Sequence, residues 1–277
     1  MRLHVEAAGP EDGAPVVFLH GVSGSMQTYA WLPEEIAEGR RIVRVDLRGH
    51  GDSEHAPGAY DIDSYGEDVA DLLRETVRRP AVLVGHSLGG VVAWGVAQRH
   101  PPELVAAAFL EDPPLYMGEP AEHELNGAVP MFRVLLDTVA RWKAQGIGAD
   151  AAAAQLAAAP FGSDRSRTSA EGLSDDVPAA RAEALLRMDP GVLEGAADRS
   201  TLSPTDPTSP VSVPVFVLGA DDEKGAAFPT RHAERLAISH PDVQIARVAG
   251  AGHMIHDERD HRGAYVAALS RFLAAHA

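Results

Sequence analysis

The stretch VLVGHSLGG, residues 82–90, decides the fold of this chain. It begins with a short, continuous apolar run, which is typical of a strand buried on both faces of a parallel sheet. A serine between two glycines follows, and a helical pattern, Val91–Arg99, comes next. The spacing G-x-S-x-G places glycines where side chains would collide in a sharp strand-to-helix turn. Such a turn exposes the Ser87 hydroxyl at a helix N-terminus, where negative charge is favoured.

Strands and helices alternate on both sides of this stretch. The apolar runs predict strands at Val16–Leu19, Ile42–Val45, Val82–Val84, Leu104–Leu110, Val215–Leu218 and Val243–Val248. Helical spacing predicts helices at Tyr65–Arg78, Val91–Arg99, Arg231–Ile238 and Ala264–Ala275. This alternation indicates an α/β fold with a mainly parallel sheet and helices on both faces.

The sequence pattern changes in the middle of the chain, which predicts that the protein has two structural parts. Residues 1–112 and 211–277 form the α/β core, and residues 113–210 form an insertion in which strand signals vanish. The insertion carries helical patterns at Phe132–Trp142, Ala149–Ala158 and Ala179–Leu186. Open α/β sheets bind ligands at the carboxyl ends of their strands, so we expect a helical cap there. A disordered insertion is the alternative, because part of the segment is rich in alanine.

Composition narrows the class of protein. The chain has 277 residues, enough for one large α/β domain with an insertion, and a formal net charge of −16. An acidic surface repels phosphate backbones and anionic headgroups, so neither nucleic acid nor membrane is an expected partner. Cysteine is absent, which excludes disulfides, thiolate catalysis and cysteine-ligated zinc. The N-terminus has no apolar stretch typical of a secretory signal, and we expect a cytoplasmic protein.

The order of the motifs resembles that of the α/β-hydrolase superfamily, over nearly the whole chain except the insertion. His20-Gly21-Val22 follows the first predicted strand and is similar to the family's HG loop. The resemblance implies that the backbone N–H groups of Val22 and Leu88 form an oxyanion hole. The segment DLRGHGDS, residues 46–53, also matches the family, and we interpret it as structural.

The resemblance further implies a Ser-His-Asp triad with Ser87 as nucleophile. His253 follows Gly250-Ala251-Gly252 after the strand Val243–Val248, in the position of the family's histidine loop. The acid is the weaker assignment. Asp222 is the first choice because it follows the strand Val215–Leu218 with G-x-x-D spacing; Asp221 is the second choice, and Glu111 or Asp112, from the preceding strand, the third.

These residues predict an enzyme that hydrolyses carboxylic esters or lactones through an acyl-enzyme intermediate. The triad suffices for acyl transfer to water, so no cofactor and no metal is implied, and the partner is a small ester-like substrate. Two alternatives stay open. One is carbon–carbon bond hydrolysis or cofactor-free perhydrolysis on the same triad, and the other is a non-catalytic binding protein. The sequence does not indicate an oligomeric state.

Overall fold

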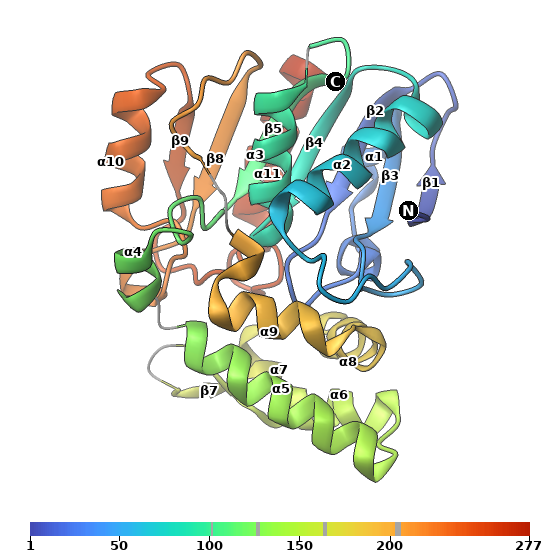
Figure 1. Ribbon diagram of the computed structural model, residues 1–277, viewed down its shortest axis with the longest axis vertical. Coiled ribbons are helices and arrows are strands. Elements are labelled where there is room, and N and C mark those ends of the chain that lie inside the picture. Colours follow the sequence, from blue (N-terminus) through green and yellow to red (C-terminus); the bar gives the residue numbers. More distant parts are fainter. Residues whose placement is uncertain (101, 126–127, 163–164, 203–205) are drawn as a thin grey trace.

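The computed structural model describes residues 1–100, 102–125, 128–162, 165–202 and 206–277. Within these residues one seven-stranded sheet has the strand order β1-β3-β2-β4-β5-β8-β9. The edge strand β1 runs antiparallel to β3, and the other neighbouring strands pair in parallel (Figure 1). The predicted α/β architecture is therefore confirmed. The strands are β1 (His4–Ala8), β2 (Ala14–Leu19), β3 (Arg40–Asp46), β4 (Ala81–His86), β5 (Val105–Glu111), β8 (Val215–Gly219) and β9 (Gln244–Arg247).

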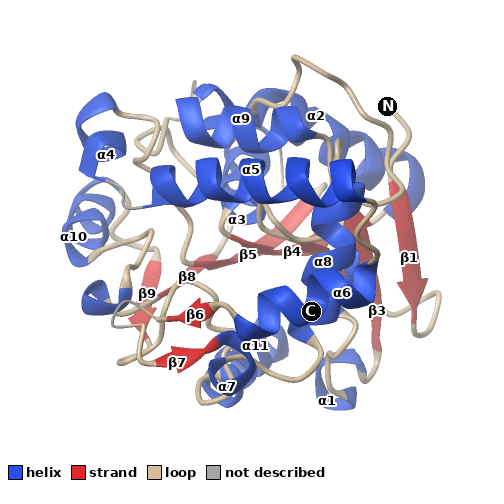
Figure 2. Cartoon of the chain, turned by 90° about the horizontal axis from the view of Figure 1, so that it is seen from below, coloured by secondary structure: helices blue, strands red, loops and turns tan. Residues whose placement is uncertain are grey.

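Helices cover both faces of the sheet (Figure 2). They are α1 (Glu34–Ala37), α2 (Ile62–Leu72), α3 (Leu88–Arg99), α10 (Thr230–Ser239) and α11 (Arg262–His276). Successive residues of a strand point to opposite faces, so the apolar run of β2 serves two cores. Val17 and Leu19 belong to the cluster that contains residues of α2 and α3, whereas Val16 and Phe18 pack with residues of α1 and α11.

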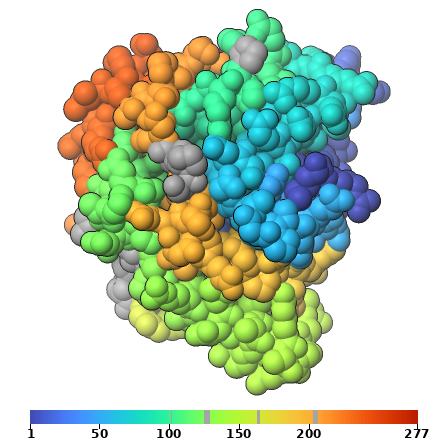
Figure 3. Space-filling model, in the orientation of Figure 1, coloured from blue at the N-terminus to red at the C-terminus, as the bar shows by residue number. Residues whose placement is uncertain are grey.

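Helices also fill most of the segment between β5 and β8. Trp142 of α5 is buried and donates its indole N–H to Gln155 of α6, 2.8 Å away, so these helices pack against each other. The segment forms the lower end of the molecule, and the parallel strands point their carboxyl ends toward it (Figures 1 and 3). Its elements are α4 (Pro120–Leu125), α5 (Ala128–Gln145), α6 (Ala149–Ala158), β6 (Pro160–Phe161), β7 (Arg167–Thr168), α7 (Ser169–Gly172), α8 (Val177–Arg187) and α9 (Pro190–Asp198).

The sequence did not predict several of these elements, among them β1 and α9. Strand β1 lies at the sheet edge, and its residues are exposed or half-buried, so it lacks the apolar run of the central strands. Helix α9 begins with Pro190 and contains two glycines, which hides its helical pattern. None of the helices in the described ranges is long and apolar enough to cross a membrane.

Candidate active site

Ser87 lies in the turn between β4 and α3 with φ 51° and ψ −114°, a strained conformation for a residue with a side chain. Both flanking glycines are required by close contacts. A Cβ at Gly85 would lie 2.2 Å from the carbonyl oxygen of Gly89, and one at Gly89 would lie 2.1 Å from that of Leu19. The expected strand–turn–helix geometry therefore has the steric cause that the sequence pattern suggested.

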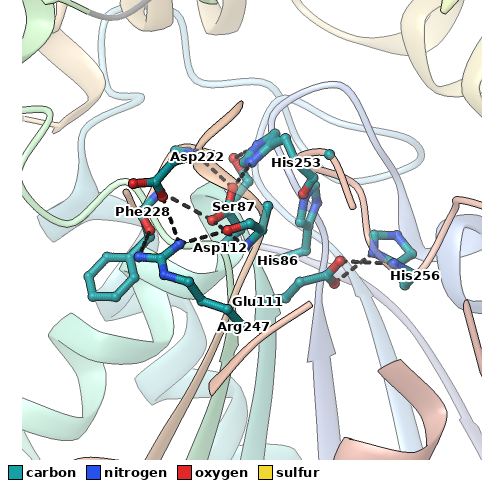
Figure 4. A network of polar contacts seen from close by, with 12 residues as sticks. His86, Ser87, Glu111, Asp112, Asp222, Phe228, Arg247, His253 and His256 are labelled. Carbon is teal, nitrogen blue, oxygen red and sulfur yellow. Dashed lines mark hydrogen bonds and ion pairs between the residues drawn. The ribbon is translucent and has the colours of Figure 1, made fainter. Parts of the chain in front are cut away.

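A chain of hydrogen bonds links Ser87 to a buried carboxylate (Figure 4). Nε2 of His253 is 2.9 Å from the Ser87 hydroxyl, and Nδ1 is 2.6 Å from a carboxylate oxygen of Asp112. Because the carboxylate can only accept, Nδ1 carries the proton and Nε2 is free to accept the serine proton. The structure thus brings Ser87 and His253 together, as the sequence predicted, but with a different acid.

Asp112 directly follows β5 and is completely buried, with φ 42°. Three backbone N–H groups donate to its carboxylate: those of Ala220 (3.1 Å), Ala227 (2.7 Å) and Phe228 (3.2 Å). These three donors satisfy the buried carboxylate in place of water. The three donors also fix its position beside the histidine loop, since β5 lies between β4 and β8 in the sheet.

The expectation that Asp222 contacts His253 is wrong. Asp222 begins a tight helical turn, and its carboxylate accepts the N–H of Thr230, at the start of α10, at 3.0 Å. It also lies 3.1 Å from Arg247. The second choice, Asp221, instead accepts the N–H of Gly250 at 2.7 Å. Both residues therefore hold loop backbone, whereas Asp112, a third choice from the sequence, reaches the imidazole.

The remaining alternative, Glu111, holds a second histidine. One of its carboxylate oxygens is 2.7 Å from Nδ1 of His256, and the other accepts the backbone N–H of His256 at 2.9 Å. Burial alone would lower the pKa of His256, but the carboxylates of Asp257 and Glu111 outweigh it and raise the pKa to about 9. Glu111 and His256 are both buried, and neither side chain bonds to the Ser87 hydroxyl. Glu111 contacts Ser87 through its backbone carbonyl, which accepts the Ser87 N–H at 3.0 Å.

His86 separates the two histidines. Its ring centroid is 4.8 Å from that of His253 and 4.8 Å from that of His256. Burial and these two neighbouring histidines hold the pKa of His86 well below its ordinary value, so the ring is neutral. Its Nε2 donates to the backbone carbonyl of His253 at 3.0 Å. His86, Glu111 and His256 lie close enough together to hold a metal. However, Nδ1 of His256 is bonded to Glu111, and Nε2 of His86 is bonded to the backbone carbonyl of His253.

The expected oxyanion donors lie on either side of Ser87. Leu88 is the first residue of α3, so its N–H has no helical acceptor. Among the described residues, the N–H of Val22 also has no hydrogen-bond partner. The loop around Val22 is fixed by two buried imidazoles. His50 Nε2 lies 3.0 Å from the carbonyl of Val22, and His20 Nδ1 lies 2.8 Å from that of Gly21.

A cavity of about 810 Å³ opens above Ser87, between the carboxyl ends of the strands and the inserted helices. Ser87 and His253 line its floor, together with the glycines of the loop that follows β2. The inserted segment contributes apolar side chains to this cavity: Met117, Met131, Phe132, Phe161, Leu173 and Val177. A cavity of this size holds a small or medium-sized organic molecule.

Comparison with known proteins defines the class to which this fold and site belong. The sequence pattern of the alpha/beta hydrolase family matches residues 16–268. The chain belongs to that family.

Individual relatives extend this result. The chain is 28% identical to a Bacillus subtilis (strain 168) protein, "Putative 2-succinyl-6-hydroxy-2,4-cyclohexadiene-1-carboxylate synthase", over 94% of this chain and 90% of the relative. It is 41% identical to sn-1-specific diacylglycerol lipase ABHD11 of Mus musculus, but over only 31% of this chain and 28% of the lipase. The solved structure of E-2-(acetamidomethylene)succinate hydrolase superposes with a TM-score of 0.72 and 22% identity, covering 98% and 95% of the two chains. The structural likeness supports the fold, and the family supports a hydrolase-type enzyme.

Proposed function

We propose that the protein hydrolyses carboxylic esters or lactones through a covalent intermediate on Ser87. The observation that carries the proposal is the continuous chain Ser87–His253–Asp112, with hydrogen bonds of 2.9 and 2.6 Å. An activated serine needs a base within hydrogen-bond reach and a third group that orients the base. Asp112 fills the third role, because its buried carboxylate accepts from Nδ1 and leaves Nε2 directed at the serine.

The chemistry follows from these three groups. The Ser87 oxygen attacks the ester carbonyl while His253 takes its proton, and the tetrahedral intermediate forms. When the carbon–oxygen bond breaks, the departing alkoxide takes that proton from His253. Water then attacks the acyl-enzyme with His253 as base, and Ser87 leaves with the returned proton. The free N–H groups of Val22 and Leu88 are the proposed donors to the oxyanion, each worth about 2.7–4 kcal/mol of barrier.

The inserted residues 113–210 act, in this proposal, as a cap on residues 1–112 and 211–277. The apolar side chains that they contribute to the cavity support an ester or lactone with an apolar part. A cap would also exclude water from the acyl-enzyme until the alcohol has left.

Two measurements on one preparation test the proposal. Hydrolysis of p-nitrophenyl acetate and butyrate reports turnover, and a fluorophosphonate probe followed by peptide mass spectrometry reports the nucleophile. We expect turnover of both esters and a single phosphonylated residue, Ser87. Labelling at another residue would refute the nucleophile. Labelling of Ser87 without turnover of esters or lactones would refute ester hydrolysis and favour the other triad reactions.

A further inference from the structure

Arg181 of α8 reaches from the inserted helices into the cavity above Ser87. Its Nη2 donates to the hydroxyl of Ser23 at 3.0 Å, and its Nη1 lies 3.0 Å from the sulfur of Met254. Ser23 follows Val22, the proposed oxyanion donor, and Met254 follows His253. The guanidinium therefore lies between the two loops that surround the reacting atoms.

Acidic partners satisfy the other arginines that line this cavity, but not Arg181. Arg167 pairs with Asp260 at 3.0 Å, and Arg231 pairs with Glu122 at 2.6 Å. Across the described parts of the chain, no carboxylate lies within 4.0 Å of the Arg181 guanidinium. Its Nε is buried and has no hydrogen-bond partner there either.

The acids that line the cavity are already engaged elsewhere. Asp176 pairs with Arg262 at 2.8 Å and Asp222 with Arg247 at 3.1 Å. Glu258 accepts from His261 at 2.9 Å. Asp257 lies 3.3 Å from Nε2 of His256. None of these described carboxylates is therefore free to neutralise Arg181.

An uncompensated, partly buried guanidinium is unusual because desolvation of a charge is costly. Burial lowers the pKa of Arg181, and the more distant charge of Asp257 only partly opposes this effect. A guanidinium nevertheless stays protonated at neutral pH. A thioether and a hydroxyl, its two present partners, carry no charge, so the cavity contains a cation that the described protein groups leave unneutralised.

We infer that Arg181 binds a carboxylate carried by the substrate, so that the preferred ester or lactone is the half-ester or lactone of an acid with a second carboxyl group. This inference rests on the proposed ester hydrolysis. The planar fork of a guanidinium matches a carboxylate with two parallel hydrogen bonds. One unpaired arginine calls for one negative charge, which fits a carboxylate better than a phosphate dianion. Because the guanidinium contacts the residues that directly follow Val22 and His253, the second carboxylate must be close to the scissile carbonyl.

Matched pairs of esters test the charge preference. Monomethyl and dimethyl esters of succinate, glutarate and adipate differ only in one carboxylate, and methanol release measures their hydrolysis. We expect the wild-type enzyme to prefer the acidic member of at least one pair in kcat/KM. In Arg181→Gln, kcat/KM for that half-ester should fall about 10- to 150-fold, the range for a hydrogen bond to a charged group. The dimethyl ester should change less than about threefold.

Two further variants separate binding from a structural effect. Arg181→Lys keeps the charge but loses the fork, and we expect an intermediate loss. Arg231→Gln removes a cavity arginine that Glu122 already neutralises, and the ratio of acidic to neutral substrate should stay unchanged. Equal losses on both members of a pair in Arg181→Gln would overturn the inference, because Arg181 would then only position the Ser23 loop.

A binding measurement keeps the inference separate from catalysis. Titration calorimetry of Ser87→Ala with succinate, glutarate and adipate needs no turnover. We expect at least one diacid to bind, and its Kd to rise about 10- to 150-fold when Arg181→Gln or Arg181→Met is added. Diacid binding without hydrolysis of any ester would retain the carboxylate site at Arg181 and refute the proposed function. Ester hydrolysis without diacid binding, or tighter binding of inorganic phosphate than of any diacid, would overturn the inference alone.

Discussion

Two carboxylate–histidine pairs lie side by side in this protein and differ in what they can do. Asp112 with His253 and Glu111 with His256 come from the same strand end and the same loop, and Figure 4 shows both. The His253 side chain is 31% exposed, and its second nitrogen faces Ser87. His256 is fully buried, and its second nitrogen faces Asp257. A carboxylate with a histidine thus makes a proton acceptor in one place and a fixed ion pair in the other.

The two pairs also differ in their surroundings, which set the protonation state of each histidine. With a pKa raised to about 9, His256 is protonated at neutral pH and cannot accept a proton. The neutral ring of His86 lies between the rings of His253 and His256, and its Nε2 donates a hydrogen bond to the backbone carbonyl of His253. We therefore expect the first pair to control turnover and the second to control stability.

The largest expected effect is on turnover in Ser87→Ala. Only the His253 pair has a hydroxyl to activate, so the buried pair cannot substitute for it. Loss of the nucleophile should lower kcat about 10⁶-fold while the thermal unfolding midpoint changes little. Steady-state hydrolysis of p-nitrophenyl butyrate and circular dichroism measure the two effects. Residual turnover near the wild-type level in a folded variant would contradict the assignment of Ser87.

The second-largest expected effect is the difference in kcat between variants of two aspartates. Asp112→Asn should lower kcat about 10⁴-fold, because an amide cannot hold the Nδ1 proton and stabilise the imidazolium. The matched control is Asp222→Asn, which removes a charge beside Arg247 and α10 but none from His253. We expect less than a tenfold loss there. A larger loss in Asp222→Asn than in Asp112→Asn would contradict the assignment of Asp112 as the acid of the triad.

The contrast between these aspartates shows how far the sequence could lead. The β4–α3 turn and the histidine loop were predictable, because glycine spacing and strand–helix order have steric causes that are local in the chain. The acid was not, since four residues at two strand ends met the positional requirement. Asp112 is distinguished by its φ of 42° and by three N–H donors from residues 220–228, which are far from it in the sequence.

The insertion also shows that local patterns were predictable and contacts between distant residues were not. Helical spacing predicted three helices in residues 113–210, and they lie within α5, α6 and α8. Arg181 falls inside one of those patterns, yet nothing in the sequence distinguished it from a solvent-exposed arginine. Its lack of an acidic partner among the described residues becomes visible only when α8 packs over the loops after β2 and β9.

A third effect should appear in stability. Glu111→Gln leaves the protonated His256 without its closest carboxylate, and breaking one partner of a buried pair costs about 3–5 kcal/mol. We expect the free energy of unfolding, measured in urea, to fall by that amount. The kcat of the remaining folded enzyme should stay within about tenfold of wild type. A loss of turnover as large as in Asp112→Asn, at unchanged stability, would show that the buried pair takes part in the reaction.

The smallest effect is the pH dependence that the buried pair gives to folding. The pKa of His256 is raised from 6.5 in the unfolded chain to about 9 in the folded protein, so folding favours its proton. This contribution is complete below about pH 6.5 and is lost as the pH rises through about 9, on the order of 3 kcal/mol in total. Other groups titrate over the same range, so the measurement is a difference between wild type and His256→Gln. Urea unfolding at about pH 6 and about pH 10 should show the stability gap between them narrowing on the alkaline side. A gap that is independent of pH would mean that His256 is neutral, and its carboxylate partners would then stabilise the fold by hydrogen bonding alone.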